Sequence, residues 1–249
     1  MQLWTPILAK TLLPAFAGML LLGFLLRKWL LSKPRSVRLI PLQIIAVLLL
    51  VLEIGKQVLS AKQGYDLYHI PLHFCSLFIF AIPVMAFYQG KHSKTVSAVV
   101  TSLCTALFLM MMIYPNLIYS DGNVLEFFQN YFSFHTVFFH NLVLLAFVLI
   151  LSLELYEPLE RGEAKAVLIF ILGYCVIGGI MAQVLKTNFN NFYSCNIPPL
   201  ESVRVMLQGV LGYGLTQFLY VLIVSILDVG FLQLSALLQR LFARGLRKL

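Results

Sequence analysis

The stretch FHTVFFHNLVLLAFVLILSL, residues 134–153, decides the fold of this chain. It contains no Asp, Glu, Lys or Arg. Because a helix of about 20 residues matches the hydrocarbon thickness of a bilayer, the stretch predicts a transmembrane helix. His135, His140 and Asn141 are polar residues that such helices seldom carry without a function.

The composition of the whole chain agrees with that stretch. Of its 249 residues, 60% are hydrophobic and 11% are charged, and the mean hydropathy is +0.90. Soluble domains have roughly 45–50% apolar and about 25% charged residues. These values exclude a soluble enzyme, a disordered chain and a nucleic-acid-binding protein, so no nucleic acid partner is expected. They indicate an all-α polytopic membrane protein.

Seven stretches of the chain are long and apolar enough to cross a bilayer. They cover approximately residues 7–28, 39–59, 70–89, 95–114, 134–153, 165–185 and 204–228. After them, residues 230–249 place Leu and Phe on one side of a helix and Arg and Lys on the other. This pattern predicts an amphipathic helix on the membrane surface, with a frayed basic tail as the alternative. The chain then divides into a seven-helix domain, 1–229, and a basic segment, 230–249.

The distribution of Lys and Arg predicts the orientation. With seven spans, thirteen of the 18 Lys and Arg residues fall on the side that holds the carboxyl terminus, and five fall on the other. The positive-inside rule then places the amino terminus outside and the carboxyl terminus in the cytoplasm. A six-span arrangement with one re-entrant piece is the alternative, and it would put the basic carboxyl terminus outside.

Polar residues from separate stretches fall in one layer, in the outer part of the membrane. They are His73 and Cys75 near the start of the third stretch, Asn116 after the fourth, His135 and His140 near the start of the fifth, and Asn190 and Asn191 after the sixth. Buried polar groups in a membrane are costly and mark functional sites. Within the second stretch, Glu53 and Lys56 predict either a pair within the helix or a polar contact inside the bundle.

Helical geometry restricts which of these polar side chains can face one common site. At 100° per residue, His73 and Cys75 are about 200° apart and His135 and His140 about 140° apart, so a single metal site is awkward. No metal and no cofactor is therefore expected. A site that takes one residue from each of two helices meets this geometric restriction more easily than a metal site does. Cys75 and His140 are such a pair, and they would supply a nucleophile and its base. Simple packing of the thiol remains the alternative.

Several sequence elements resemble one family of membrane proteins. The segment YHIPLHFCSL, residues 68–77, resembles the signature of the bacterial YwaF-like proteins, which are related to the eukaryotic transmembrane protein 164 family. The elements YPN at 114–116, FHTVFFH at 134–140 and NFNNFY at 188–193 follow in that family's order. The eukaryotic members have Asn-Pro-Cys-His where this chain has His-Phe-Cys-Ser, so the His after the Cys is absent here.

The resemblance implies a membrane acyltransferase that acts on phospholipids, with Cys75 and His140 as the catalytic pair. Under this hypothesis His73, Asn116, His135, Asn190 and Asn191 supply substrate or oxyanion contacts, and the partners are membrane phospholipids. Two alternatives stay open. One is a small-solute transporter or channel, which would need a polar path to the inner face through scattered residues such as Glu53, Gln183 and Asp228. The other is a non-enzymatic integral membrane subunit.

Overall fold

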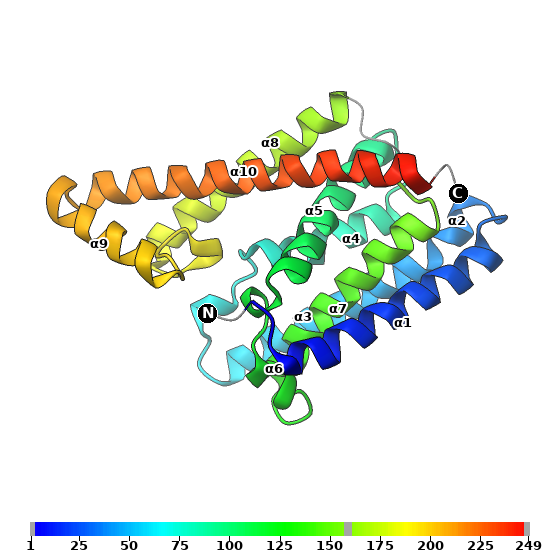
Figure 1. Ribbon diagram of the computed structural model, residues 1–249, viewed down its shortest axis with the longest axis horizontal. Coiled ribbons are helices and arrows are strands. Elements are labelled where there is room, and N and C mark those ends of the chain that lie inside the picture. Colours follow the sequence, from blue (N-terminus) through cyan, green and yellow to red (C-terminus); the bar gives the residue numbers. More distant parts are fainter. Residues whose placement is uncertain (1–2, 157–160, 247–249) are drawn as a thin grey trace.

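The computed structural model describes residues 3–156 and 161–246, and the regular structure within those ranges is helical. The α-helices are α1 (Pro6–Leu30), α2 (Arg35–Arg38), α3 (Ile40–Lys62), α4 (Phe78–Phe87), α5 (Ser93–Ile113), α6 (Asp121–Leu125), α7 (Tyr131–Ser152), α8 (Arg161–Leu185), α9 (Pro198–Leu211) and α10 (Tyr213–Leu246). Four short 3₁₀ turns are η1 (Leu67–His69), η2 (Phe74–Leu77), η3 (Pro115–Leu117) and η4 (Phe189–Asn191). Figure 1 shows α10 running along the length of the molecule and α5 crossing the molecule at a steeper angle.

Six helices in the described ranges are long and apolar enough to cross a membrane, which supports a multi-pass membrane protein. The expected third span, 70–89, is shorter than predicted, because its helical part covers only Phe74–Phe87. Pro71 cannot donate a helical hydrogen bond, and His73 has an extended backbone with ψ 152°. The predicted count of seven spans is therefore not confirmed by helix length.

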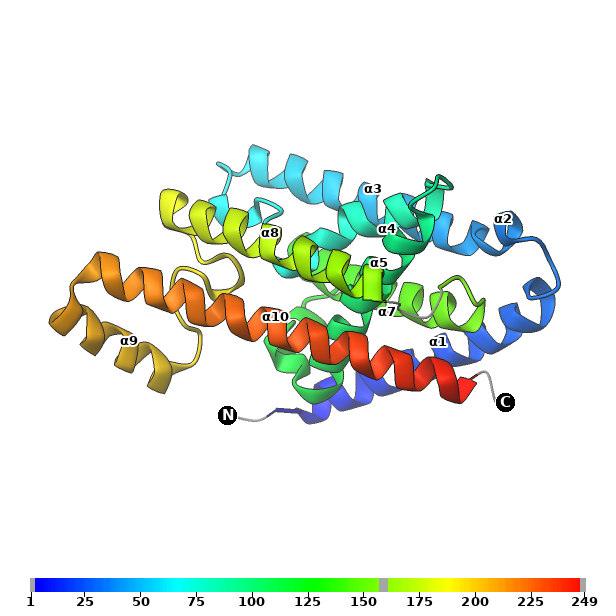
Figure 2. The ribbon, with the colours of Figure 1, turned by 90° about the horizontal axis from the view of Figure 1, so that it is seen from above.

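Hydrogen bonds between segments that are distant in the sequence show in which direction each helix runs. Gln43 near the start of α3 donates to Ala86 O at the end of α4, at 3.2 Å, so these two helices are antiparallel. Ser97 near the start of α5 donates to Leu155 O just after α7, at 3.1 Å. Trp4 before α1 donates to Met112 O at the end of α5, at 3.1 Å. Successive long helices thus alternate in direction, and Figure 2 shows α1 and α10 running in the same direction.

Three arginines meet the carboxyl end of α7. Arg27 donates to Ser152 O, Arg38 to Leu153 O and Arg35 to Leu155 O, each at 2.8 Å. The last carbonyls of a helix lack partners within it and carry partial negative charge. These three arginines, which the positive-inside rule predicts to be cytoplasmic, are therefore also held by hydrogen bonds to the carboxyl end of α7.

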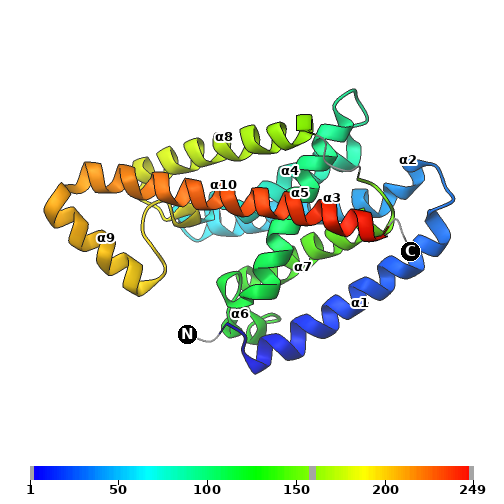
Figure 3. The same ribbon diagram turned by 45° about the horizontal axis from the view of Figure 1, so that its top comes forward.

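The last predicted span differs most from the structure. The stretch 204–228 is interrupted at Gly212, whose φ of 76° suits glycine, so α9 and α10 form a hairpin that projects from the bundle (Figure 3). α10 then passes Gly230 without a break, and Leu232 and Ala236 are buried in the bundle. The expected separate helix at 230–249 is thus a continuation of α10. Its side chains after residue 238, and residues 247–249 entirely, lie outside the described part of the chain.

Candidate functional site

A cavity of about 290 Å³ lies where the second half of α3, the start of η2, the first turns of α7 and the loop after α8 meet. The predicted residues that line it are His73, Cys75, His135, His140, Asn190 and Asn191. Asn116 lies in η3 and is not among the lining residues. Six of the seven residues selected from the sequence thus come together around one cavity.

His73 and Cys75 both reach the cavity because they are not on a regular helix. His73 is extended and immediately precedes η2, a 3₁₀ turn that leads into α4. The separation of about 200° expected for a regular helix does not apply here, because the backbone is extended at His73 and forms a 3₁₀ turn from Phe74.

α7 presents its two histidines at the edges of one face. Phe132, Thr136 and Phe139 line the cavity along the centre of that face, with His135 on one edge and His140 on the other. The separation of about 140° is that of the edges of a broad helix face. Both imidazoles are 7% exposed, so they are buried in the bundle and still reach the cavity.

The tautomer of His140 follows from its hydrogen bond. Its Nδ1 lies 2.6 Å from Thr136 O, and a carbonyl oxygen can only accept, so Nδ1 carries the proton and donates it. Nε2 of the neutral ring is then an acceptor. It is buried and has no hydrogen-bond partner within the described residues. A buried imidazole nitrogen with an unused lone pair is available as a base.

Cys75 occupies the first turn of the helical segment Phe74–Phe87 and is half-buried. Because His140 Nε2 has no partner in the described structure, the thiol and the imidazole share the cavity without a hydrogen bond between them.

A buried charged cluster forms another wall of the cavity. Lys56 Nζ lies 2.9 Å from Glu53 Oε1, which confirms the predicted pair within the helix, and Gln57 donates to the same oxygen at 2.7 Å. His135 Nε2 lies 3.2 Å from Glu53 Oε2, a distance that permits attraction although the geometry is not that of a hydrogen bond. The sequence left open a pair within the helix or a polar contact inside the bundle, and both are present. It did not identify His135 on α7 as the partner inside the bundle.

His69 and His73 line the cavity on the segment between α3 and η2. His69 Nδ1 lies 2.7 Å from Ser60 Oγ, and His73 Nε2 donates to Tyr68 O at 3.0 Å. Burial lowers the pKa of both His69 and His73 below the ordinary imidazole value of 6.5. Both rings are therefore neutral near pH 7, which leaves them as hydrogen-bonding groups and not as fixed charges.

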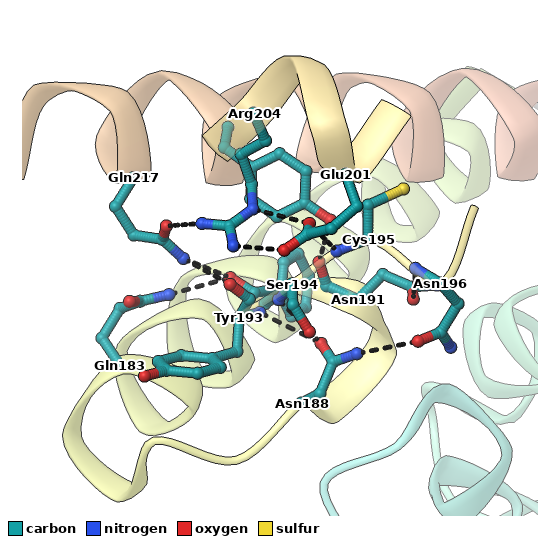
Figure 4. A network of polar contacts seen from close by, with 12 residues as sticks. Gln183, Asn188, Asn191, Tyr193, Ser194, Cys195, Asn196, Glu201, Arg204 and Gln217 are labelled. Atoms are coloured by element: carbon teal, nitrogen blue, oxygen red, sulfur yellow. Dashed lines mark hydrogen bonds and ion pairs between the residues drawn. The ribbon is translucent and has the colours of Figure 1, made fainter. Parts of the chain in front are cut away.

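The loop between α8 and α9 forms the remaining wall, and side-chain amides hold its backbone (Figure 4). Asn188 Oδ1 accepts from the backbone N–H groups of Tyr193 and Ser194, at 3.2 and 3.1 Å. Asn190 and Asn191 have φ values of 47° and 60°, a region that asparagine tolerates better than most residues. The Asn-rich stretch NFNN is therefore needed for this backbone conformation as well as for polarity.

One side of α9 fixes the same loop (Figure 4). Glu201 accepts from the backbone N–H of Cys195 at 2.8 Å and from Arg204 Nε at 2.7 Å. Arg204 also donates to Gln217 on α10, at 2.9 Å, and Gln217 donates to Tyr193 O at 2.8 Å. Hydrogen bonding to Arg204 lowers the pKa of the Glu201 carboxyl. The sequence interpretation missed this network because it began a membrane span at residue 204.

The loop is also tied to α10 from within the bundle. Asn190 Nδ2 donates to Asp228 Oδ2 at 2.6 Å, and Tyr220 donates to Asn191 O at 2.7 Å. All four cysteines are free. In residues 3–156 and 161–246, no group of three or more His, Cys, Asp and Glu side chains is arranged to hold a metal ion.

Comparisons with known proteins give one family. Neither the curated proteins nor the solved structures contain a match to the chain. The model of the TMEM164 family matches residues 4–228, a range that contains every residue of the cavity. This match confirms the resemblance to transmembrane protein 164, whereas the YwaF-like name stays a prediction. The chain therefore belongs to the TMEM164 family.

Proposed function

We propose that the protein is a membrane-embedded acyltransferase that moves an acyl chain between phospholipids through a thioester on Cys75. The observation that carries the proposal is that His140, whose buried Nε2 is fixed as an acceptor without a partner in the described residues, lines the same cavity as Cys75. A thiol needs a nearby base to become a nucleophile at neutral pH, and an imidazole in this tautomer is such a base.

The chemistry balances in two steps. In the first, His140 Nε2 takes the Cys75 proton, Sγ bonds to the ester carbonyl carbon, and the carbon–oxygen bond breaks as the proton passes to the leaving lysolipid oxygen. In the second, the hydroxyl of an acceptor lysolipid gives its proton to His140 and bonds to the thioester carbon. The carbon–sulfur bond then breaks, and the proton returns to sulfur.

The surroundings of Cys75 support stabilisation of the tetrahedral oxyanion. The first N–H groups of a helix have no acceptor within it, so those of Phe74 and Cys75 are available to donate to the oxyanion. Asn190 and Asn191 line the same cavity, whereas Asn116 does not, and we assign no oxyanion role to Asn116. Catalytic hydrogen bonds are often long in the absence of substrate, so the pair is expected to close when lipid binds.

The proposal includes a position in the membrane. The segment Phe74–Phe87 lies antiparallel to α3 and, with the six long helices, would make seven passes with the amino terminus outside. The cavity would then lie near the ester carbonyls of the outer leaflet. The proposed location is the bacterial cytoplasmic membrane.

The transporter alternative gains no specific support. Glu53 lines the cavity, Asp228 is bonded to Asn190, and Gln183 donates to Phe192 O at 2.8 Å. These side chains belong to the cavity or to its loop, and they do not mark a path to the other face.

The test measures acyl transfer between defined phospholipids by the purified protein in vesicles. We expect Cys75→Ser and His140→Ala each to lower the rate by at least about 100-fold, the scale of a lost acid–base group. Cys104→Ser is the matched control, because Cys104 is a buried cysteine that does not line the cavity. Transfer at the wild-type rate by both cavity variants would refute the proposal.

A further inference from the structure

Lys56 is the only Lys or Arg among the described residues that line the cavity beside Cys75, and the proposed chemistry gives it no part. Its side chain is 12% exposed and belongs to α3, a candidate membrane span. Charged side chains within membrane spans are costly, and those that occur usually face a ligand or an ion pathway. A role in ligand binding would account for this charge inside the bundle.

Glu53 balances the charge of Lys56 without using all of its hydrogen bonds. Lys56 Nζ lies 2.9 Å from Glu53 Oε1, and an ammonium can donate more than one hydrogen bond. Within residues 3–156 and 161–246, no second acceptor bonds to Nζ. The Glu53 carboxylate is also shared, because Gln57 donates to Oε1 at 2.7 Å and His135 Nε2 lies 3.2 Å from Oε2. The remaining N–H groups of Lys56 are therefore available to a ligand in the cavity.

The charge of Lys56 acts on the side of the cavity that holds Cys75. His73 immediately precedes the turn that contains Cys75. Burial lowers the pKa of His73 most, and the Lys56 ammonium lowers it further. Among the described groups, Glu53 does not contribute to the pKa of His73. An anionic group on this side of the cavity would therefore be attracted by Lys56 more than it is repelled by Glu53.

The size and contents of the cavity indicate which anion fits. About 290 Å³ is at the lower end of the range of small-molecule sites, so the cavity suits the polar part of a lipid and not its chains. The group of a phospholipid that is always ionised at neutral pH is its phosphate. Only the glycerol backbone separates this phosphate from the ester groups. A phosphate at Lys56 would thus leave an ester in the cavity that Cys75 and His140 line.

We propose that Lys56 binds the ionised phosphate of a phospholipid and so holds the ester carbonyl of that lipid beside Cys75. Lys56 is then a substrate-binding residue that selects lipids with a phosphate over neutral glycerolipids. The inference rests on the proposed function for the fate of the ester. The binding of the phosphate can be tested without the reaction.

The experiment compares the binding of two lipids to the full chain with Cys75→Ala, which cannot form the thioester. Oleoyl-lysophosphatidylcholine and oleoylglycerol have the same chain, and only the first has a phosphate. Each is titrated into the protein in maltoside micelles, and native mass spectrometry measures the fraction of protein that retains one lipid. We expect lysophosphatidylcholine to bind at least about tenfold more tightly, the scale of one hydrogen bond to a charged group.

Two variants remove the ammonium in different ways. Lys56→Met combined with Glu53→Gln leaves no unpaired buried carboxylate, and Lys56→Gln keeps an amide that can donate to Glu53. The preference for lysophosphatidylcholine should disappear in both. Two variants are used because one could disturb folding, which size exclusion and helical content would reveal. Because an ammonium repels choline, a preference that depends on Lys56 reports on the phosphate.

Lys62→Met is the matched control, because Lys62 is an exposed lysine of the same helix that does not line the cavity. This variant should keep the preference. A preference that is missing from the protein with Lys56 in place, that survives in both Lys56 variants, or that is lost equally in Lys62→Met would overturn the proposal.

Inorganic phosphate distinguishes a lipid site from a site for free phosphate. Added at the same concentration as lysophosphatidylcholine, it should leave the lipid bound, because it lacks the glycerol and the chain that add to the binding of the lipid. Displacement of the lipid under these conditions would assign Lys56 to free phosphate and overturn the lipid proposal.

This proposal and the acyltransferase proposal fail in different ways. Equal binding of the two lipids by a protein that still transfers acyl chains would remove the role of Lys56 and leave the acyltransferase. A preference that depends on Lys56, without any transfer by the wild-type protein, would leave the phosphate site and remove the acyltransferase.

Discussion

At the scale of single residues, the buried pair of Glu53 and Lys56 is the most costly polar feature of the site. Their side chains are only 8% and 12% exposed. Breaking a buried pair by removing one partner leaves an uncompensated charge and costs about 3–5 kcal/mol. We expect Glu53→Gln to lower the free energy of unfolding by that amount, measured by denaturant titration in mixed micelles.

The control for this prediction is Glu154→Gln. Glu154 pairs with Arg27 at 3.0 Å, but the two side chains are 56% and 39% exposed, so the loss should be at most about 1 kcal/mol. The double variant Glu53→Gln with Lys56→Met should lose less than the sum of its single variants, because it removes both charges together. Equal losses for Glu53→Gln and Glu154→Gln would contradict this account of the pair.

The residues of the site were predictable to different degrees. Cys75 and His140 stand out in the sequence because polar groups in apolar stretches are rare. The contact of His135 with Glu53 was not predictable, since it depends on how α3 and α7 pack. The free Nε2 of His140 depends on its rotamer, which places Nδ1 on the carbonyl of Thr136 one turn earlier. Side-chain placement of this kind has no signature in residue spacing.

At the scale of elements, the loop between α8 and α9 depends on the ionised Glu201 carboxylate. Hydrogen bonding to Arg204 holds its pKa below the ordinary value of 4.5. A lowered pKa in the folded state gives stability that is present above pH 4.5 and is lost as the pH falls through the folded-state pKa. We therefore expect the loop to loosen below pH 4.5 and to be insensitive between pH 5 and pH 7.

Hydrogen exchange of the Cys195 amide measures this directly, because that N–H donates to Glu201 Oε2. After correction for the intrinsic rate, its protection should fall on acidification in the wild type. In Glu201→Gln protection should be low at every pH and should not change further. Acid loss of protection that is the same in Glu201→Gln would show that another group controls the loop.

The elements that the sequence misplaced have local physical causes. The stretch 204–228 is largely apolar, and its three glycines, Gly209, Gly212 and Gly214, do not show by themselves that the chain turns at Gly212 between α9 and α10. The stretch 70–89 is equally apolar, but Pro71 and the extended His73 delay the helix to Phe74. Hydropathy measures which residues prefer lipid. It does not measure where the backbone changes direction.

At the scale of the whole molecule, the alternating direction of the helices predicts the membrane topology. If the segment Phe74–Phe87 is counted as a seventh transmembrane helix, the two termini lie on opposite sides of the membrane. Reporter domains fused to each terminus should therefore show the amino terminus outside and the carboxyl terminus in the cytoplasm. Both reporters on one side would show that the short segment does not cross.

The proposed mechanism requires Cys75 to carry the acyl chain during transfer. The most direct measurement is mass spectrometry of the purified protein after incubation with phospholipid vesicles, with the acyl donor present and the acceptor left out. We expect one acyl group on the peptide that contains Cys75, removed by hydroxylamine as a thioester is, and absent from Cys75→Ala. Transfer of acyl chains with no acyl group ever found on Cys75 would contradict it.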